Sequence, residues 1–399
     1  MIHNCVGAPV TGDDFFGREA DQRRCWESLG SDHLLLLAPR RVGKTSLMLR
    51  LREGAFANEF EATYLSGADA EDEAHFVQKL FEAVAALHVW RGAWQHLLES
   101  PAGQILRRIQ KVEVSEFAVE LQGAEREQWP LLGERLARAL DQQEGRCLLL
   151  VDEVPVFVLR LLRLDPSGER ARRFLTWFRG LRQRSGRAGG LRWLLAGSIG
   201  LDTVAGRLNL GDTINDLRLF SLGPFSPEVA DQLLRALAAT HGLPLSEEVR
   251  RHVLDRIGWN IPYYVQLVFA ELLEICPGNA SAATVAHVDQ AFESLLKPAR
   301  KAYFDYWRQR LVEELGRPDA DHALTLLNTI AAAENGASSS TLRQVLAKQV
   351  RDTGERREKL RYLLDVLEGD GYVVPTGGGD RFLFRSPLLR EFWIRRVLP

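Results

Sequence analysis

The chain reads LLLLAPRRVGKTSL from Leu34 to Leu47, and this stretch decides the fold that we expect. Four consecutive leucines before a loop that contains proline predict a short strand buried on both faces, as in a parallel sheet. The apolar spacing after the loop predicts a helix over residues 46–53. The loop therefore ends at a helix N-terminus, where backbone N–H groups and the helix dipole favour anions.

Residues 38–46 of this stretch, APRRVGKTS, are called the GKT loop below. They match the phosphate-binding motif G-x-x-x-x-G-K-[ST], except that Ala38 stands where the motif has its first glycine. The motif predicts that Lys44 contacts the β- and γ-phosphates and that the Thr45 hydroxyl ligates Mg²⁺. The alternative is a chance Gly-Lys-Thr in an ordinary turn. We expect ATP and Mg²⁺ as cofactors, with the nucleotide bound by Ala38, Pro39, Arg40, Arg41, Val42, Gly43, Lys44, Thr45 and Ser46.

A second apolar run, CLLLVDE at residues 147–153, ends in two acids and has the form of a Walker B strand. Asp152 is predicted to act with Thr45 at the metal and to orient its bound water. Glu153 is predicted to be the general base that polarises the attacking water. The alternative is an acidic turn cap after a core strand, which the presence of Lys44 in the same chain makes the minor interpretation.

A third apolar run ends at Ser198. Open parallel sheets bind ligands at the carboxyl ends of their strands, so Ser198 is the predicted sensor of the γ-phosphate. A plain Gly-Ser turn is the alternative. With Lys44, Asp152 and Glu153, Ser198 completes the predicted catalytic set.

Composition narrows the class of protein. In 399 residues, 46% are hydrophobic and 26% are charged, which is ordinary for a soluble globular protein with more than one domain. No apolar run approaches the ~18 residues that cross a bilayer, and the N-terminus lacks a basic signal region, so we expect a cytoplasmic protein without a membrane partner. The four scattered cysteines indicate neither zinc nor disulfides. A net charge of −2 does not by itself indicate nucleic-acid binding.

The element pattern predicts three domains. Strands and helices alternate over residues 1–222, which predicts a parallel sheet covered by helices on both faces. Within this region, residues 112–121 have a β-hairpin pattern to which we assign no function. Short helices separated by proline and glycine then predict a helical lid domain over residues 223–296, with helices at 227–239, 246–257 and 262–275.

Residues 297–399 are predicted to form a linker helix and a winged helix-turn-helix, because three helices precede a hairpin with a glycine-rich tip. Recognition helices place basic side chains in the DNA major groove. The alternative is a solvated mixed-charge helix in a domain that packs on the rest of the chain. The candidate DNA contacts are Arg356, Arg357, Lys359, Arg361 and Arg381.

These motifs together resemble the archaeal-type ATPase family, a branch of P-loop NTPases between the STAND signalling ATPases and the origin-recognition branch of AAA+. The resemblance covers nearly the whole chain. It implies an ATPase core, a helical lid and a C-terminal winged helix, with Gly17, Arg18 and Pro262 near the adenine. The residues that carry it are FGRE at 16–19, PRRVGKTS at 39–46, VDE at 151–153, Gly197-Ser198, 258–262 and FRSPLLREFW at 384–393.

Two arginine positions that are expected in related ATPases affect the mechanism that we expect. Many AAA+ proteins place an arginine directly after the lid proline to grip the γ-phosphate, whereas this chain has Tyr263, which implies slow hydrolysis. An arginine finger for a neighbouring subunit is expected between Ser198 and residue 219, and Arg207 and Arg218 are its two candidates.

The leading hypothesis is a nucleotide-controlled switch of the AAA+/STAND type, in which ATP closes the lid and reorients the winged helix toward DNA or a protein partner that acts in trans. One alternative is a DNA-binding regulator in which ATP is structural. Another is an oligomeric loader or remodelling motor, which assembles into a nucleotide-dependent homo-oligomer. The resemblance is compatible with a role in signalling, in mobile elements or in defence, and it does not choose among the three.

Overall fold

The computed structural model describes residues 1–85, 87–88, 128–141, 145–184, 190–197, 210–277 and 282–398. The chain forms two compact units. The sheet unit comprises Arg18–Ala38 and Lys44–Leu222, and the helical unit comprises Met1–Gly17, Pro39–Gly43 and Gly223–Pro399. The predicted hairpin at residues 112–121 lies outside the described residues. Within the described ranges, no helix has the length and apolar character needed to cross a membrane.

The sheet unit is built on five strands in the order β2-β3-β4-β1-β5, and every neighbouring pair is parallel. The predicted parallel sheet is therefore confirmed, and the leucine run forms its fourth strand in that order. Strand β4 separates the strand that leads into the GKT loop from the strand that ends in Asp152. The strands are β1 (His33–Leu37), β2 (Phe60–Ser66), β3 (Arg146–Asp152), β4 (Leu191–Gly197) and β5 (Leu217–Ser221).

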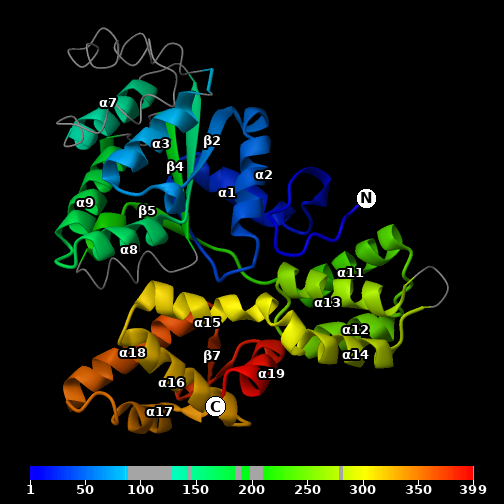
Figure 1. The fold of residues 1–399 in the computed structure, drawn as a ribbon. Coiled ribbons are helices and arrows are strands. Elements are labelled where there is room, and N and C mark those ends of the chain that lie inside the picture. Colours follow the sequence, from blue (N-terminus) through cyan, green and yellow to red (C-terminus); the bar gives the residue numbers. More distant parts are fainter. Residues whose placement is uncertain are drawn as a thin grey trace. The chain divides into compact units, whose positions relative to one another are not determined.

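Helices cover both faces of this sheet, as Figure 1 shows for α1 and α2 on one side and α3, α7, α8 and α9 on the other. Alternate residues of a strand point to opposite faces, and here both sets are buried: Leu149 and Trp193 belong to the core with α3, α7, α8 and α9, while Leu148 and Leu194 face away from it. The helices are α1 (Glu19–Leu29), α2 (Lys44–Glu53), α3 (Glu73–Ala85), α7 (Trp129–Asp141), α8 (Val154–Leu164) and α9 (Glu169–Arg184).

One boundary differs from the sequence-based expectation, and one helix after the acid pair was not predicted. Helix α2 begins at Lys44 rather than at residue 46, so the lysine already belongs to the first helical turn. Helix α8 follows directly after Glu153, with Pro155 in its first turn. Proline is tolerated there because the first N–H groups of a helix have no intrahelical partner. Strand β3 ends at Asp152, and α8 begins at Val154, one residue before this proline.

Four helices come first in the segment Gly223–Pro399, which is the largest part of the helical unit. The three predicted helices are confirmed, and a fourth, α14, was not predicted. Ser226 and Ser246 cap two of them by accepting hydrogen bonds from the backbone N–H groups of Val229 and Val249. The four are α11 (Pro227–His241), α12 (Glu247–Ile257), α13 (Pro262–Ile275) and α14 (Val285–Leu295).

Helix α15 (Ala302–Leu315) then leads into a winged helix, whose three-stranded antiparallel sheet has the order β6-β8-β7. The expected boundaries after residues 222 and 296 fall in connections between elements. The winged-helix elements are α16 (Asp319–Ala332), β6 (Ala337–Ser338), α17 (Ser339–Leu346), α18 (Thr353–Gly369), β7 (Val373–Thr376), β8 (Arg381–Phe384) and α19 (Pro387–Arg396).

The winged helix packs directly on the α11–α14 helices where α19 meets the end of α12. The fully buried Ser386 hydroxyl donates to the Ile257 carbonyl over 3.2 Å. Gly258 has φ +66°, and a Cβ there would lie 2.5 Å from Pro387 Cδ. Only glycine therefore fits at this position, both for its conformation and for its close approach.

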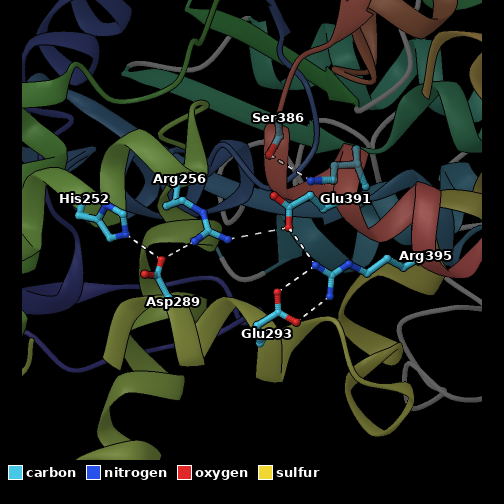
Figure 2. Close-up of polar contacts among 8 residues, drawn as sticks. His252, Arg256, Asp289, Glu293, Ser386, Glu391 and Arg395 are labelled. Carbon is cyan, nitrogen blue, oxygen red and sulfur yellow. Dashed lines mark hydrogen bonds and ion pairs between the residues drawn. The ribbon is translucent and has the colours of Figure 1, made fainter. Parts of the chain in front are cut away.

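A charged network surrounds this joint (Figure 2). Arg256 of α12 pairs with Asp289 of α14 and approaches Glu391 of α19 at 3.9 Å. Arg395 of α19 forms a bidentate pair with Glu293 of α14, at 2.7 and 2.9 Å. Three helices of two predicted domains are thus tied together within one compact unit.

Candidate functional site

The GKT loop joins β1 to α2 with two left-handed residues, Arg41 (φ 65°) and Gly43 (φ 99°). Glycine adopts this conformation without strain, whereas a non-glycine residue costs about 1 kcal/mol or more. Lys44, at the start of α2, is only 7% exposed, and its ammonium donates to the Ala38 carbonyl over 2.7 Å. Within the sheet unit, the lysine side chain therefore reaches back to the first residue of the loop.

Asp152, the last residue of β3, lies against the first turn of α2. The residue is 2% exposed. Oδ2 accepts hydrogen bonds from the Thr45 hydroxyl (2.7 Å) and the Tyr64 hydroxyl (3.2 Å), and Oδ1 accepts one from the Glu153 N–H (2.9 Å). The structure thus brings Thr45 and Asp152 together, as expected, and adds Tyr64, which the sequence analysis did not select.

Tyr64 acts here as a hydrogen-bond donor. Burial, followed by the negative charges of Asp152 and Glu153, raises the pKa of its hydroxyl well above the ordinary value for tyrosine. The raised pKa keeps the hydroxyl protonated near neutral pH, as a hydrogen-bond donor must be. A tyrosine at a strand end is a weak sequence signal, because the sequence does not show that β2 and β3 are neighbours.

Glu153 caps α8 with left-handed backbone angles, φ 51° and ψ 35°. Gly67 makes this turn possible, since a Cβ at Gly67 would lie 3.2 Å from the Glu153 carbonyl oxygen and 3.3 Å from that of Asp152. Strained backbone of this kind clusters at functional sites because the surrounding structure must stabilise it. Glu153 therefore occupies a left-handed turn directly after the buried residue Asp152.

The middle of the GKT loop belongs to the helical unit, where the Arg41 side chain lies between two aromatic rings. Its guanidinium carbon is 4.2 Å from the ring centre of Tyr263, in the first turn of α13, and 4.4 Å from that of Tyr306 in α15. Stacking of this kind contributes about 0.5–2 kcal/mol per ring. We call these three residues the arginine clamp.

A second contact of the same segment involves Pro39. A Cβ at Gly371, at the start of the β7–β8 wing, would lie 2.9 Å from Pro39 Cβ and 2.5 Å from the Trp259 ring. Gly371 has φ +85°, so glycine is required here both for this backbone conformation and for the close approach of the two neighbouring side chains. Residues 39–43 therefore pack on both the α11–α14 helices and the winged helix.

The residues that the resemblance placed near adenine are divided between the units. Gly17 (φ +68°) is in the helical unit, where a Cβ would lie 2.4 Å from Val229 of α11. Arg18 is in the sheet unit, 6% exposed and paired with Asp21 at 3.1 Å, and burial lowers the pKa of its guanidinium. Pro262 opens α13. The positions of Gly17, Arg18 and Pro262 near the adenine base remain predictions.

Two predicted site residues, Ser198 and Arg207, lie outside the described residues. Arg218 is described: it lies on β5 with its side chain 59% exposed and pairs with Asp32 at 3.3 Å. Use of Arg218 as an arginine finger would require this exposed pair to open, which costs little in water.

The five candidate DNA contacts have unequal surroundings. Arg357 and Arg361 are exposed on α18, and Arg356 makes local contacts with the Arg351 carbonyl and the Thr353 hydroxyl. In contrast, Lys359 pairs at 2.6 Å with Asp319, which is 3% exposed. Arg381 donates to the carbonyls of Asn335 and Gly336. Lys359 and Arg381 thus have structural partners within the winged helix.

Two solved structures have a similar fold over nearly the whole chain. The Walker-type ATPase of Pyrococcus abyssi has a TM-score of 0.60 and 18% identity, with 98% of this chain and 99% of that chain covered. The ORC2 protein of Aeropyrum pernix, solved as ADPNP–ADP complexes, has a TM-score of 0.52 and 13% identity, with 96% and 95% covered. No protein-family model and no curated protein matches the chain. The chain has a P-loop ATPase fold with a C-terminal winged helix.

Proposed function

We propose that this protein is an ATP-binding and ATP-hydrolysing molecular switch that couples its nucleotide state to the winged helix. The 2.7 Å hydrogen bond between Thr45 and Asp152 carries the proposal. Two motifs that are 107 residues apart were assigned separately to one metal site, and their side chains meet. A chance Gly-Lys-Thr turn and an unrelated acidic cap give no reason for this contact.

The donor set suits Mg²⁺. A threonine hydroxyl and a carboxylate are hard oxygen ligands, and Mg²⁺ is usually held by one or two such protein groups together with phosphate and water. We assign Thr45 and Asp152 to the metal and Lys44 to the β- and γ-phosphates. Mg²⁺, when bound, neutralises charge on the phosphates.

Glu153 is the proposed general base. Its carboxylate accepts a proton from the water whose oxygen attacks the γ-phosphorus, and the β–γ bridging oxygen leaves with ADP. The strained turn at Glu153 supports this role, because it fixes the base directly after the residue assigned to the metal. Ser198 remains the proposed sensor of the γ-phosphate.

The arginine clamp supports coupling between the nucleotide and the winged helix. A nucleotide that contacts the GKT loop would change the position of Arg41. Because Arg41 stacks against Tyr263 and Tyr306, this change would also affect the two tyrosines. A ligand shifts an equilibrium only by binding one state better than the other. The clamp provides contacts that can differ between the two states, and α15 leads directly into the winged helix.

DNA is the proposed partner of the winged helix. Three arginines of α18, the half-buried Arg356 and the exposed Arg357 and Arg361, would contact phosphates, because that helix carries no Asn or Gln for bidentate reading of adenine. Binding of this kind tolerates many sequences and weakens with salt. A protein partner acting in trans is the alternative outcome of the test below.

Lys44→Ala should weaken ATP binding about 10-fold or more, because charge-assisted hydrogen bonds contribute about 1.5–3 kcal/mol. Lys79→Ala is the matched control, since Lys79 is a lysine of the same unit that pairs with Glu82 on the surface of α3. Titration calorimetry with ATP measures both. Equal ATP affinity in the wild type and in Lys44→Ala would contradict the phosphate assignment.

Glu153→Gln should bind ATP like the wild type and lose hydrolysis about 10²- to 10⁴-fold, because an amide can hold a water molecule but cannot take its proton. Single-turnover hydrolysis and equilibrium binding separate the two effects. Glu169→Gln, at an exposed site on α9, controls for the loss of one charge. Hydrolysis at the wild-type rate in Glu153→Gln would exclude Glu153 as the base.

Tyr306→Leu should uncouple α15 from the nucleotide, because it removes one ring of the arginine clamp, while Tyr306→Phe keeps the ring and should behave like the wild type. Hydrogen exchange of residues 302–315 is measured with and without ATP. We expect ATP to change this exchange in the wild type and in Tyr306→Phe but much less in Tyr306→Leu. The same ATP response in all three proteins would argue against the clamp as the coupling element.

Arg356→Ala with Arg357→Ala should weaken DNA binding for every sequence and leave ATP affinity unchanged. Each neutralised phosphate contributes about −0.9 to the slope of log affinity against log salt, so the slope should become shallower by about 1 to 2. A control with Arg235→Ala and Arg251→Ala removes two exposed arginines of the α11–α14 helices. If the wild type with ATP binds no DNA at low salt, or the double variant binds as tightly as the wild type, the winged helix is assigned to protein contacts.

A further inference from the structure

Tyr64 is a hydrogen-bond donor to Asp152 that the function proposed above does not use. The Asp152 carboxylate receives three hydrogen bonds from three parts of the sheet unit: the backbone after β3, the first turn of α2, and the end of β2. Thr45 and Tyr64 both donate to Oδ2. Two of the three donors belong to the loop and turn already assigned to the nucleotide site, and Tyr64 is the third.

The strand register explains why Tyr64 reaches this carboxylate. In the parallel pair β2–β3, Ser66 lies beside Asp152 and Tyr64 lies beside Leu150. Residues two apart on a strand point to the same face, so Tyr64 and Asp152 are diagonal neighbours on one face of the sheet. The tyrosine side chain is long enough to span this diagonal, since its hydroxyl lies 3.2 Å from Asp152 Oδ2. A one-residue shift in register would send Tyr64 to the opposite face.

The Glu153 N–H holds Oδ1 and the Thr45 hydroxyl holds Oδ2, so a further donor to Oδ2 adds to the restraint on the turn of the carboxylate about its Cβ–Cγ bond. The Tyr64 hydroxyl restrains that turn, because it approaches Oδ2 from a strand rather than from the GKT loop. Partners that orient a metal ligand in this way typically change metal affinity 10- to 100-fold when they are lost.

We infer that Tyr64 is a positioning residue of the nucleotide site, whose hydroxyl holds Asp152 in the orientation that serves a divalent cation bound with ATP. The inference rests on the proposed function, because it assigns Asp152 to the metal. It predicts a specific division of effects. Loss of the Tyr64 hydroxyl impairs the contribution of the metal to ATP binding and spares the contribution of the GKT loop.

The test is Tyr64→Phe, which removes the hydroxyl and keeps the ring. ATP affinity is measured by calorimetry in Mg²⁺ and in EDTA, and Mn²⁺ binding to the ATP complex is measured by electron paramagnetic resonance. We expect the gain in ATP affinity from Mg²⁺ to fall about 10-fold and the dissociation constant of Mn²⁺ to rise by a similar factor. ATP affinity in EDTA should stay within about 2-fold of the wild type.

Thr63→Val is the matched control. It removes a hydroxyl from the adjacent residue of β2, whose side chain points to the opposite face and donates to the Ala83 carbonyl over 2.7 Å. Thr63→Val should leave both metal measurements unchanged. In an Asp152→Asn background, the effect of Tyr64→Phe on Mg²⁺ dependence should largely disappear, because a positioning residue acts through the group that it holds.

Three results would overturn the inference. The first is an unchanged Mg²⁺ dependence in Tyr64→Phe. The second is an equal loss of ATP affinity in Mg²⁺ and in EDTA, which would assign Tyr64 to the architecture of the loop. The third is a wild-type protein whose ATP binding does not respond to Mg²⁺, and this result alone would also overturn the proposed function.

Discussion

The buried carboxylate of Asp152 is the constraint on which the rest of the site depends. Taking an ionised group out of water costs several kcal/mol, and the cost is offset only when hydrogen bonds replace the lost solvation. Three donors do so here, from β2, from the first turn of α2 and from the β3–α8 turn. To satisfy this one group, three segments that are distant in sequence must meet at the carboxyl edge of the sheet.

Of the three non-glycine residues with left-handed backbone angles in the described part of the chain, two lie in the turns that leave this edge. Arg41 and Glu153 both have left-handed backbone angles, which residues with a Cβ adopt at a cost of about 1–3 kcal/mol. Neighbouring contacts stabilise each turn: aromatic stacking holds Arg41, and the missing side chain of Gly67 makes room beside Glu153. Both strained residues lie where the chain changes from strand to helix, and both belong to the motifs that suggested the function.

The GKT loop is divided between the two units. Its first residue and its lysine belong to the sheet unit, and residues 39–43 belong to the helical unit, where they contact α13, α15 and the wing. The α11–α14 helices and the winged helix are themselves joined by the buried Ser386 hydrogen bond and by the close approach at Gly258. Within the helical unit, a displacement of residues 39–43 would therefore act directly on both the α11–α14 helices and the winged helix.

The sequence by itself determined the local elements. The leucine run, the GKT loop, the acid pair after β3 and the order of helices and hairpin at the C-terminus all rest on short-range signals such as periodicity, caps and turn residues. Only the tertiary structure decided that β4 lies between β1 and β3, that β2 is the neighbour of β3, and that Arg41 stacks between Tyr263 and Tyr306. The physical reason is that strand order, register and side-chain stacking depend on contacts between residues far apart in the chain, and a local pattern does not specify its distant partner.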